Sequence, residues 1–411
     1  MANKPKIRFK GFDDAWEQRK LDDWGTFYYG KSCPKWSVTE DSTTPCIRYG
    51  ELYTKFGAKI DRVYSYTNMS PENLRFSKGT EVLIPRVGED PMDYNHCTWL
   101  SMPNVAIGEM ISVFNTDNNP LFTAMMFNAT LQNEFAMRVE GGSVTNLYFE
   151  KLKSIEVSFP SIPEQEKIAA YFDSIDHLIT LHQRKCDQMK ELKKYMLTKM
   201  FPQNGAKVPE IRFDGFIDDW EQRKLGDVVE RVTRKNQDLV SQLPLTISAQ
   251  YGLIDQNMFF DKRVASKDVS GYYLIYNGEF AYNKSTSSDA PWGAIKRLDR
   301  YENGVLSTLY IVFKIKNEKV INSDFLVTYY DTCNWHKDIK AVAAEGARNH
   351  GLLNIAPADF FKTELMLPQD IEEQKKIGSY FKLIDHLITL HQSKCENLKN
   401  LKEYLLRNMF V

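Results

Sequence analysis

The sequence contains no long apolar run and little cysteine. No stretch of the 411 residues reaches the roughly 18 uncharged apolar residues that a membrane span requires. Residues 1–10 contain no apolar core of the kind found in secretory signals, so none is expected there. The six cysteines include no C-x-x-C pair. They are expected to be reduced thiols of a cytoplasmic protein rather than a disulfide framework.

The sequence also lacks an excess of charge of either sign. It has 53 basic and 54 acidic residues, a net charge of -1, so composition alone indicates no polyanionic partner. Hydrophobic residues make up 43% and aromatic residues 13%, which is enough to build cores and excludes wholesale disorder. The length predicts two or three domains.

An internal repeat is the strongest signal. Residues 5–21 read PKIRFKGFDDAWEQRKL and residues 209–225 read PEIRFDGFIDDWEQRKL, with 13 of 17 positions identical. Residues 164–201 (EQEKIAAYFDSIDHLITLHQRKCDQMKELKKYMLTKMF) recur as residues 373–410, with 24 of 38 positions identical. The chain is therefore a tandem duplication.

The two segments between the repeated elements differ. Residues 22–160 and 226–368 have similar lengths but little identity, and their net charges are -5 and zero. Strand-like runs at 81–84 and 305–315, with helical stretches near 120–134 and 323–344, predict a mixed α/β domain in each. Shared ends with divergent middles suggest one scaffold that presents two different surfaces.

Each long repeat has the periodicity of a coiled-coil seam. Apolar residues recur at alternating spacings of four and three, although a histidine and a lysine (His182 and Lys193, His391 and Lys402) interrupt both series. Pro163 is expected to precede the first helix and Pro202 to follow it. The predicted apolar seam residues are Ile168, Phe172, Ile175, Ile179 and Met189 in the first helix, and Ile377, Phe381, Ile384, Ile388 and Leu398 in the second.

Each seam requires a partner, and the chain supplies two helices of about 57 Å. The predicted fold is α/β: two tandem α/β domains separated by two long helices that pair as an antiparallel coiled coil. Periodicity alone does not choose the partner, so two separate helices, each packed on its own domain, remain the alternative.

Motifs for catalysis are weak. Residues 25–32 (GTFYYGKS) fit the P-loop expression, but residues 21–24 are a poor buried strand and Pro34 would fall in the first helical turn. Residues 119–122 (NPLF) lack the second proline of the tetrapeptide found in adenine methyltransferases. His96 has no zinc-ligand spacing, and the helical histidines lie five residues apart. No catalytic centre, metal site or cofactor site is expected in this chain.

The repeated IDHLITLHQ helices, each preceded by a proline-bearing strand end (residues 159–160 and 367–368), resemble the specificity subunit of type I restriction-modification systems. Further phrases in the same order are IRYGEL (47–52), KGTEVLIP (78–85), SAQYGLI (248–254), GEFAYNK (278–284) and GARNHGLLNI (346–355). The segment 22–160 departs from the family pattern, because it has Gly141-Gly142-Ser143 where the segment 226–368 has Gly346-Ala347-Arg348.

The resemblance implies a noncatalytic subunit with target recognition domains at 1–160 and 204–369, a central helical spacer at 161–203 and a C-terminal spacer at 370–411. Each recognition domain would read half of a split double-stranded DNA target. Two methyltransferase subunits, which use S-adenosylmethionine, and restriction subunits, which use ATP and Mg²⁺, would be the partners. A coiled-coil scaffold without DNA specificity is the rival hypothesis, and sequence-selective DNA binding would separate the two.

Candidate DNA contacts are loop residues with donor chemistry, because Arg reads guanine and Asn reads adenine. For each of them a surface ion pair or a phosphate contact is the alternative role. The candidates are Arg48 and Arg86 in the first domain, and Lys284, Ser285, Lys296, Arg297, Arg348 and Asn349 in the second.

Overall fold

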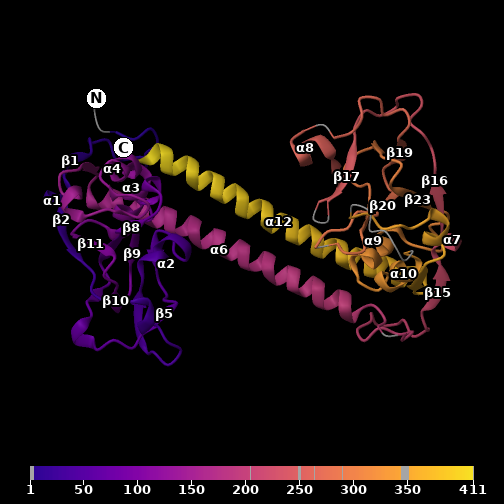
Figure 1. The fold of residues 1–411 in the computed structure, drawn as a ribbon, viewed down its shortest axis with the longest axis horizontal. Coiled ribbons are helices and arrows are strands. Elements are labelled where there is room, and N and C mark those ends of the chain that lie inside the picture. Colours follow the sequence, from indigo (N-terminus) through magenta and orange to yellow (C-terminus); the bar gives the residue numbers. More distant parts are fainter. Residues whose placement is uncertain are drawn as a thin grey trace. The chain divides into compact units, whose positions relative to one another are not determined.

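The structure, a computed structural model, describes residues 4–203, 205–248, 251–262, 264–288, 290–343 and 351–410. The chain forms two compact units, and each contains parts of both long helices (Figure 1). Unit 1 comprises Met1–Gln183 and Ser393–Val411, and unit 2 comprises Arg184–Gln392.

Unit 1 is a mixed α/β domain whose strands form four sheets. The two larger sheets have five strands, in the order β2-β11-β7-β9-β4, and four strands, in the order β5-β3-β10-β6. The two smaller sheets are β1-β14 and β12-β13-β8. The strands are β1 (Glu17–Lys20), β2 (Gly25–Tyr29), β3 (Thr44–Ile47), β4 (Lys59–Ile60), β5 (Ser65–Thr67), β6 (Phe76–Lys78), β7 (Glu81–Pro85), β8 (Val87–Gly88), β9 (Thr98–Leu100), β10 (Pro103–Ile107), β11 (Ile111–Thr116), β12 (Glu140–Gly141), β13 (Thr145–Asn146) and β14 (Glu156–Phe159).

Short helices cover these sheets. The helical stretch predicted near 120–134 forms two consecutive helices, and the Asn119 side chain caps the first by accepting a hydrogen bond from Phe122 N at 3.0 Å. The helices of unit 1 are α1 (Leu21–Trp24), α2 (Tyr49–Thr54), α3 (Pro120–Thr130), α4 (Gln132–Ala136) and α5 (Phe149–Leu152), with single 3₁₀ turns at Lys35–Ser37, Pro71–Asn73 and Pro91–Asp93.

Unit 2 has the same class of architecture with a different arrangement of strands. Its sheets are β16-β23-β20-β21, β15-β24, β17-β18 and β19-β22. The strands are β15 (Glu221–Lys224), β16 (Val229–Val232), β17 (Leu245–Ser248), β18 (Gly252–Asp255), β19 (Tyr273–Tyr276), β20 (Phe280–Asn283), β21 (Ala294–Arg297), β22 (Asn303–Leu306), β23 (Ile311–Ile315) and β24 (Glu364–Leu367). The helices are α7 (Leu225–Val228), α8 (Gln256–Phe260), α9 (Ser323–Asp331), α10 (His336–Val342) and α11 (Pro357–Phe360).

The two long helices are α6 (Ile162–Lys199) and α12 (Ile371–Met409). Within unit 1 they run antiparallel, because Phe172 contacts Phe410 whereas Asp176 accepts from Lys402 Nζ at 2.5 Å. Within unit 2, Lys193 donates to Asp385 at 2.7 Å. Among the described residues, no helix is long and apolar enough to cross a membrane.

The seam residues are placed as the heptad pattern requires. Six are buried, namely Ile168, Phe172, Ile175, Ile377, Phe381 and Ile384, and the others, Ile179, Met189, Ile388 and Leu398, are half-buried. The interrupting His182, Lys193, His391 and Lys402 are half-buried as well. Both helices therefore use this face for packing within their units.

Duplicated side chains make duplicated contacts. Arg8 binds Glu164 through two hydrogen bonds of 2.6 and 2.7 Å, and Arg212 binds Glu373 in the same way at 2.7 and 2.8 Å. Both glutamates are about 1% exposed, so each ion pair satisfies a buried charge. The pairs fasten residues at the start of each repeat to the first turn of the long helix that ends it.

Two details differ from the sequence predictions, and a glycine of α12 marks a close contact. The run 305–315 is not one strand, because Ser307–Tyr310 forms a turn between β22 and β23. Pro163 lies inside the first turn of α6 rather than before it, a position where its missing N–H leaves no bond unmade. Gly378 marks a close approach: a Cβ there would lie 2.7 Å from Phe325 N of α9.

Candidate nucleic-acid interface

Arg86 of unit 1 lies directly after β7, with its guanidinium beside two tyrosine rings. Its Cζ is 4.5 Å from the ring centroid of Tyr29 and 5.2 Å from that of Tyr148. Nη1 donates to Glu109 O at 3.3 Å, while Nε is buried and has no hydrogen-bond partner among the described residues. A guanidinium whose plane is fixed by aromatic rings is preorganised for bidentate contact with a guanine or a phosphate.

The Tyr29 ring is itself held in place. Its hydroxyl donates to Glu150 Oε2 at 2.7 Å. Burial and the Glu150 carboxylate raise the pKa of Tyr29 to about 12, so the ring stays neutral at physiological pH. A neutral phenol keeps the electron-rich face that attracts a cation. This cluster therefore favours one orientation of Arg86.

Arg48 occupies the junction of β3 and α2. Its backbone N–H donates to Glu51 Oε2 at 3.0 Å, and its carbonyl oxygen accepts from Glu51 N at 3.0 Å. The residue is half-buried. The sharp change from strand to helix thus fixes the backbone from which the Arg48 side chain projects.

Lys284 and Ser285 follow β20 in unit 2. Lys284 Nζ donates to Ile355 O at 3.5 Å, and burial lowers the pKa of Lys284. Ser285 is exposed and forms an isolated antiparallel bridge with Leu352. The two candidates therefore adjoin the chain that leads out of residues 344–350. Arg348 and Asn349 lie in that stretch, outside the described residues.

Lys296 and Arg297, on β21, are occupied by carboxylates of their own unit. Lys296 Nζ donates to Asp331 Oδ1 at 2.8 Å. Arg297 donates to Asp299 at 2.6 Å and to Asp324 at 2.8 Å, and its side chain is only 12% exposed. In this structure both side chains tie β21 to α9 and its surroundings.

Asp331 at the end of α9 joins this network to the long helices. Lys193 of α6 donates to Asp331 Oδ2 at 2.7 Å and to Asp385 of α12 at 2.7 and 2.9 Å. Burial by itself would raise the pKa of Asp331, but the charges of Lys296 and Lys193 lower it below its usual value. Sequence reasoning identified Lys193 as an interruption of the seam, yet gave no sign of its partner on α9.

The P-loop-like residues are not a phosphate cradle. Residues 25–29 form β2, which pairs along its length with β11, and Lys31 Nζ donates to Glu72 O at 2.9 Å. A Cβ at Gly30 would lie 2.0 Å from Gly108 O, so this glycine permits a close backbone approach. The next α-helix begins only at Tyr49, whereas a P-loop opens directly into a helix.

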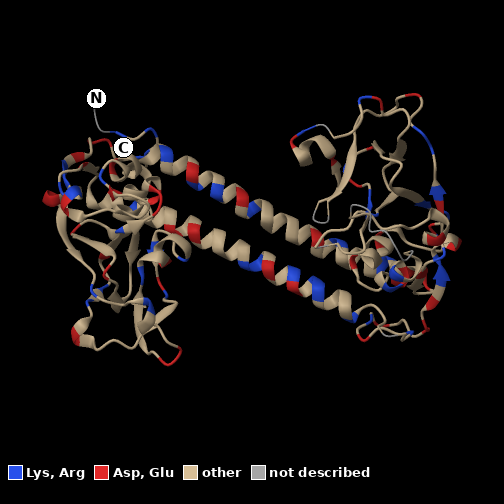
Figure 2. Ribbon diagram, in the orientation of Figure 1, with Lys and Arg blue, Asp and Glu red and all other residues tan. Residues whose placement is uncertain are grey.

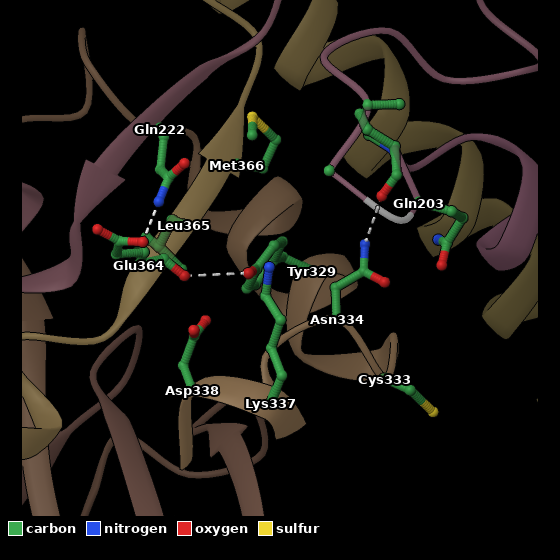
Figure 3. A pocket seen from close by; sticks show the side chains of 13 residues that line it. Gln203, Gln222, Tyr329, Cys333, Asn334, Lys337, Asp338, Glu364, Leu365 and Met366 are labelled. Atoms are coloured by element: carbon green, nitrogen blue, oxygen red, sulfur yellow. Dashed lines mark hydrogen bonds between the residues drawn. The ribbon is translucent and has the colours of Figure 1, made fainter. Parts of the chain in front are cut away.

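Unit 2 contains a cavity of about 370 Å³ that is lined by several polar side chains (Figure 3). Tyr329 donates to Glu364 O at 3.2 Å, and Gln222 donates to the Glu364 carboxylate. Burial raises the pKa of Asp338. Cys333 points away from these groups in Figure 3, so the cavity holds no thiol beside a base. The described residues contain no group of three side chains that could hold a metal ion.

Charge is dispersed over the ribbon of each unit, and basic and acidic segments alternate along both long helices (Figure 2). The helices also carry exposed apolar side chains outside the seam. These are Ile162, Tyr171, Leu178, Leu401 and Tyr404 in unit 1, and Leu192, Tyr195, Leu383 and Leu390 in unit 2, each between 37% and 57% exposed.

Comparison with known proteins identifies the family. The chain is similar to the S subunit of a type I restriction-modification system from M. genitalium, with 12% identity over 99% of both chains and a TM-score of 0.62, which shows a common fold. It is also similar to the HsdS subunit from Thermoanaerobacter tengcongensis, with 14% identity over 96% of both chains and a TM-score of 0.44. The model of the type I restriction modification DNA specificity domain matches residues 13–191 and 217–400. The chain therefore belongs to the family of type I restriction modification DNA specificity domains, the noncatalytic specificity subunits of these systems.

Proposed function

We propose that this specificity subunit recognises a split double-stranded DNA target, with one half read by each recognition domain. The recognition domains would span residues 1–160 and 204–369, and residues 161–203 and 370–411 would form the helical spacers between them. The proposal rests on a contrast within the chain. Scaffold contacts such as Arg8–Glu164 and Arg212–Glu373 are duplicated, whereas the segments between the repeated elements share little sequence identity. A scaffold alone gives no reason for divergence confined to the middles.

Joining two readers in one chain makes the second contact nearly intramolecular. Two modest half-site affinities then combine without any new contact, provided that the spacer fits the gap between the half-sites. A net charge of -1 limits the share of binding that attraction to phosphates can supply. Base contacts and partner subunits would supply the rest.

Arg86 is the best-supported candidate reader of the first domain, because two tyrosine rings and Glu109 O fix its guanidinium. We propose Arg48, Lys284 and Ser285, together with Arg348 and Asn349, as further DNA contacts. Lys296 and Arg297 could contact DNA only by giving up bonds to Asp331, Asp299 and Asp324. We therefore propose that Lys296 and Arg297 act indirectly in recognition, by holding β21 in place.

The partners would be two methyltransferase subunits and the restriction subunits of a type I system, acting in the cytoplasm. Two pairs of exposed side chains on α6 and α12 occupy equivalent positions of the repeat: Leu192 matches Leu401 and Tyr195 matches Tyr404. Equivalent apolar surfaces suit two copies of one partner. S-adenosylmethionine, ATP and Mg²⁺ would be bound by those subunits, and this chain would bind none of them.

The proposal is tested by expressing the chain with the methyltransferase encoded beside it and mapping N6-methyladenine in host DNA by single-molecule sequencing. We expect a split motif with a fixed gap, methylated on both strands and lost when this chain is deleted. A stable complex that methylates without any motif, or whose motif persists after deletion of this chain, would overturn the proposal and favour a scaffold role.

A further inference from the structure

We infer that residues 48–66 of unit 1, the α2–β5 segment, form a surface that contacts the sugar–phosphate backbone of duplex DNA. The inference rests on the proposed function and adds a contact surface to it. The segment carries four basic residues, Arg48, Lys55, Lys59 and Arg62, and two acidic ones, Glu51 and Asp61. Residues 22–160 as a whole are acidic, with a net charge of -5, so this segment concentrates the cations of an acidic domain.

Two cations flank an exposed tyrosine. Lys55 Nζ lies 5.2 Å from the ring centroid of Tyr64, and Arg62 Cζ lies 5.4 Å from it. The Tyr64 side chain is 45% exposed. Tyr66, which lies on β5, is 41% exposed. The result is a surface on which aromatic rings and positive charges alternate.

The inward-facing acid of the segment supports this surface. Glu51 is 6% exposed and accepts from Ser65 Oγ at 2.7 Å and from Lys55 Nζ at 3.1 Å. It thereby joins α2 to β5, which Figure 1 places on the same side of unit 1. Asp61 is exposed and remains the one acid at the surface.

Lys59 has a structural role. Its Nζ lies 3.3 Å from Asp173 of α6 and 5.4 Å from the ring centroid of Trp99. These contacts attach the segment to the long helix within unit 1. Lys55, whose Nζ also donates to Glu51, and Arg62 are the two exposed cations of the segment, whereas Arg48 is half-buried.

Unit 2 also has exposed aromatic side chains in its divergent segment. There the chain leaves β17 and presents Tyr251, which is 50% exposed and lies 6.0 Å from Arg300 Cζ. Helix α8 follows, with Met258 81%, Phe259 47% and Phe260 44% exposed. Both units therefore expose aromatic side chains in their divergent segments, but with different chemistry.

Duplex DNA is the ligand that fits these groups best. Lysine and arginine neutralise phosphates and release condensed counterions, and tyrosine hydroxyls donate to phosphate oxygens. Phosphate contacts carry no sequence information but fix the register of the protein on the duplex. The α2–β5 segment would thus position unit 1, and other residues would read bases.

The test measures binding of the full chain to a fluorescein-labelled, mixed-sequence duplex of about 30 base pairs, by anisotropy between roughly 50 and 200 mM NaCl. The double variant Lys55→Gln/Arg62→Gln should reduce the slope of log K against log salt by about 2, as expected for two lost phosphate contacts. Tyr64→Ala should weaken binding and leave the slope unchanged, because it removes no charge. The control Lys10→Gln/Lys20→Gln removes two exposed charges from the same unit and should leave the slope unchanged.

Acetylation footprinting gives a second readout. Because it uses the chain without substitutions, misfolding of a variant cannot affect the result. The duplex should protect Lys55 from acetylation and leave Lys20 reactive. Wild-type binding with an unchanged slope in the double variant, or with no protection of Lys55, would overturn the inference and leave the proposed function standing. Failure of the wild-type chain to bind any duplex would count against both.

Discussion

The two units build equivalent cores from different parts of the chain. In unit 1, Trp16 and Phe122 pack against Phe410, which follows α12, with ring centroids 6.4 and 5.4 Å away. In unit 2 the equivalent of Phe410 is Phe201, which follows α6 and lies 5.7 Å from the rings of both Trp220 and Phe325. Each unit thus takes one aromatic side chain from the end of the helix that belongs to the other repeat.

The comparison shows which contacts are the same in both repeats and which have diverged. The aromatic cores and the Arg–Glu pairs are the same in both units, whereas residues on α3 and α9 differ. At the place where α9 has Asp331, α3 has Asn128, whose amide donates to Cys97 O at 2.8 Å instead of binding a lysine. Lys193 consequently has two carboxylate partners, while its equivalent Lys402 has Asp176.

The largest effect is expected from the shared aromatic side chains. Phe201→Ala should destabilise unit 2 by about 3 to 5 kcal/mol, because the side chain is 1% exposed and fills the centre of an aromatic cluster. Phe410→Ala should destabilise unit 1 by less, since Phe410 is 7% exposed. Hydrogen exchange of peptides from α9 and α3 would measure the two effects separately. Equal loss of protection in both units after either change would contradict the comparison.

The two equivalent lysines should differ in importance. Lys193→Met leaves Asp331 with one cation, and we expect a cost of about 2 to 3 kcal/mol in unit 2, in the range for a charged hydrogen bond lost at a largely buried site. Lys402→Met is the matched control and should cost under about 1 kcal/mol, because Asp176 is 39% exposed. Urea unfolding of both variants, followed by hydrogen exchange, gives the ranking. A costlier Lys402 variant would show that Asp331 contributes nothing.

Gly378 and Ala169 occupy the same place in the two long helices. Gly378→Ala should destabilise unit 2 by about 1 to 3 kcal/mol, because its Cβ would clash with the backbone of α9 near Phe325. The converse change, Ala169→Gly, should cost about 1 kcal/mol through helix propensity together with lost packing. Thermal unfolding of both variants decides the matter, and a Gly378→Ala protein as stable as wild type would refute the close approach.

The smallest expected difference between the units is in how their stability depends on pH. The folded pKa of Asp331 lies below its usual 3.8, so its ionised form stabilises unit 2 above that value. This stabilisation is lost as the pH falls through the folded pKa. Asp331→Asn should therefore destabilise the protein at about pH 7 and have a smaller effect at about pH 3. An equal loss of stability at both pH values would show that ionisation of Asp331 does not stabilise unit 2.

The duplicated elements could be predicted from sequence because their chemistry is local. The seam residues repeat at helical spacing, so the helices at 162–199 and 371–409 and their packing face follow from periodicity. The end of α6 before Pro202 follows from turn chemistry, and the helical stretch predicted near 323–344 forms two helices, α9 and α10. The family model confirmed the resemblance that the repeated phrases carried.

The middles could not be predicted in the same detail because their contacts are nonlocal. Nothing near Arg297 in sequence indicates that Asp324 will bind it from 27 residues away. Arg86 gains its position from Tyr29 and Tyr148, which flank it by more than fifty residues on each side. The α2–β5 segment had a signal in its interspersed tyrosines and basic residues, and the structure adds that Tyr64 and Tyr66 are both exposed.

The central claim is that each unit reads its own half of a split DNA target. It is tested most directly by replacing residues 22–160 with the corresponding segment of a family member that has a different methylation motif, and by mapping methyladenine in cells that also express the methyltransferase. The account predicts that one half of the motif changes to that of the donor, while the other half and the gap stay as they were. A motif that changes in both halves, or that does not change at all in an intact complex, would contradict it.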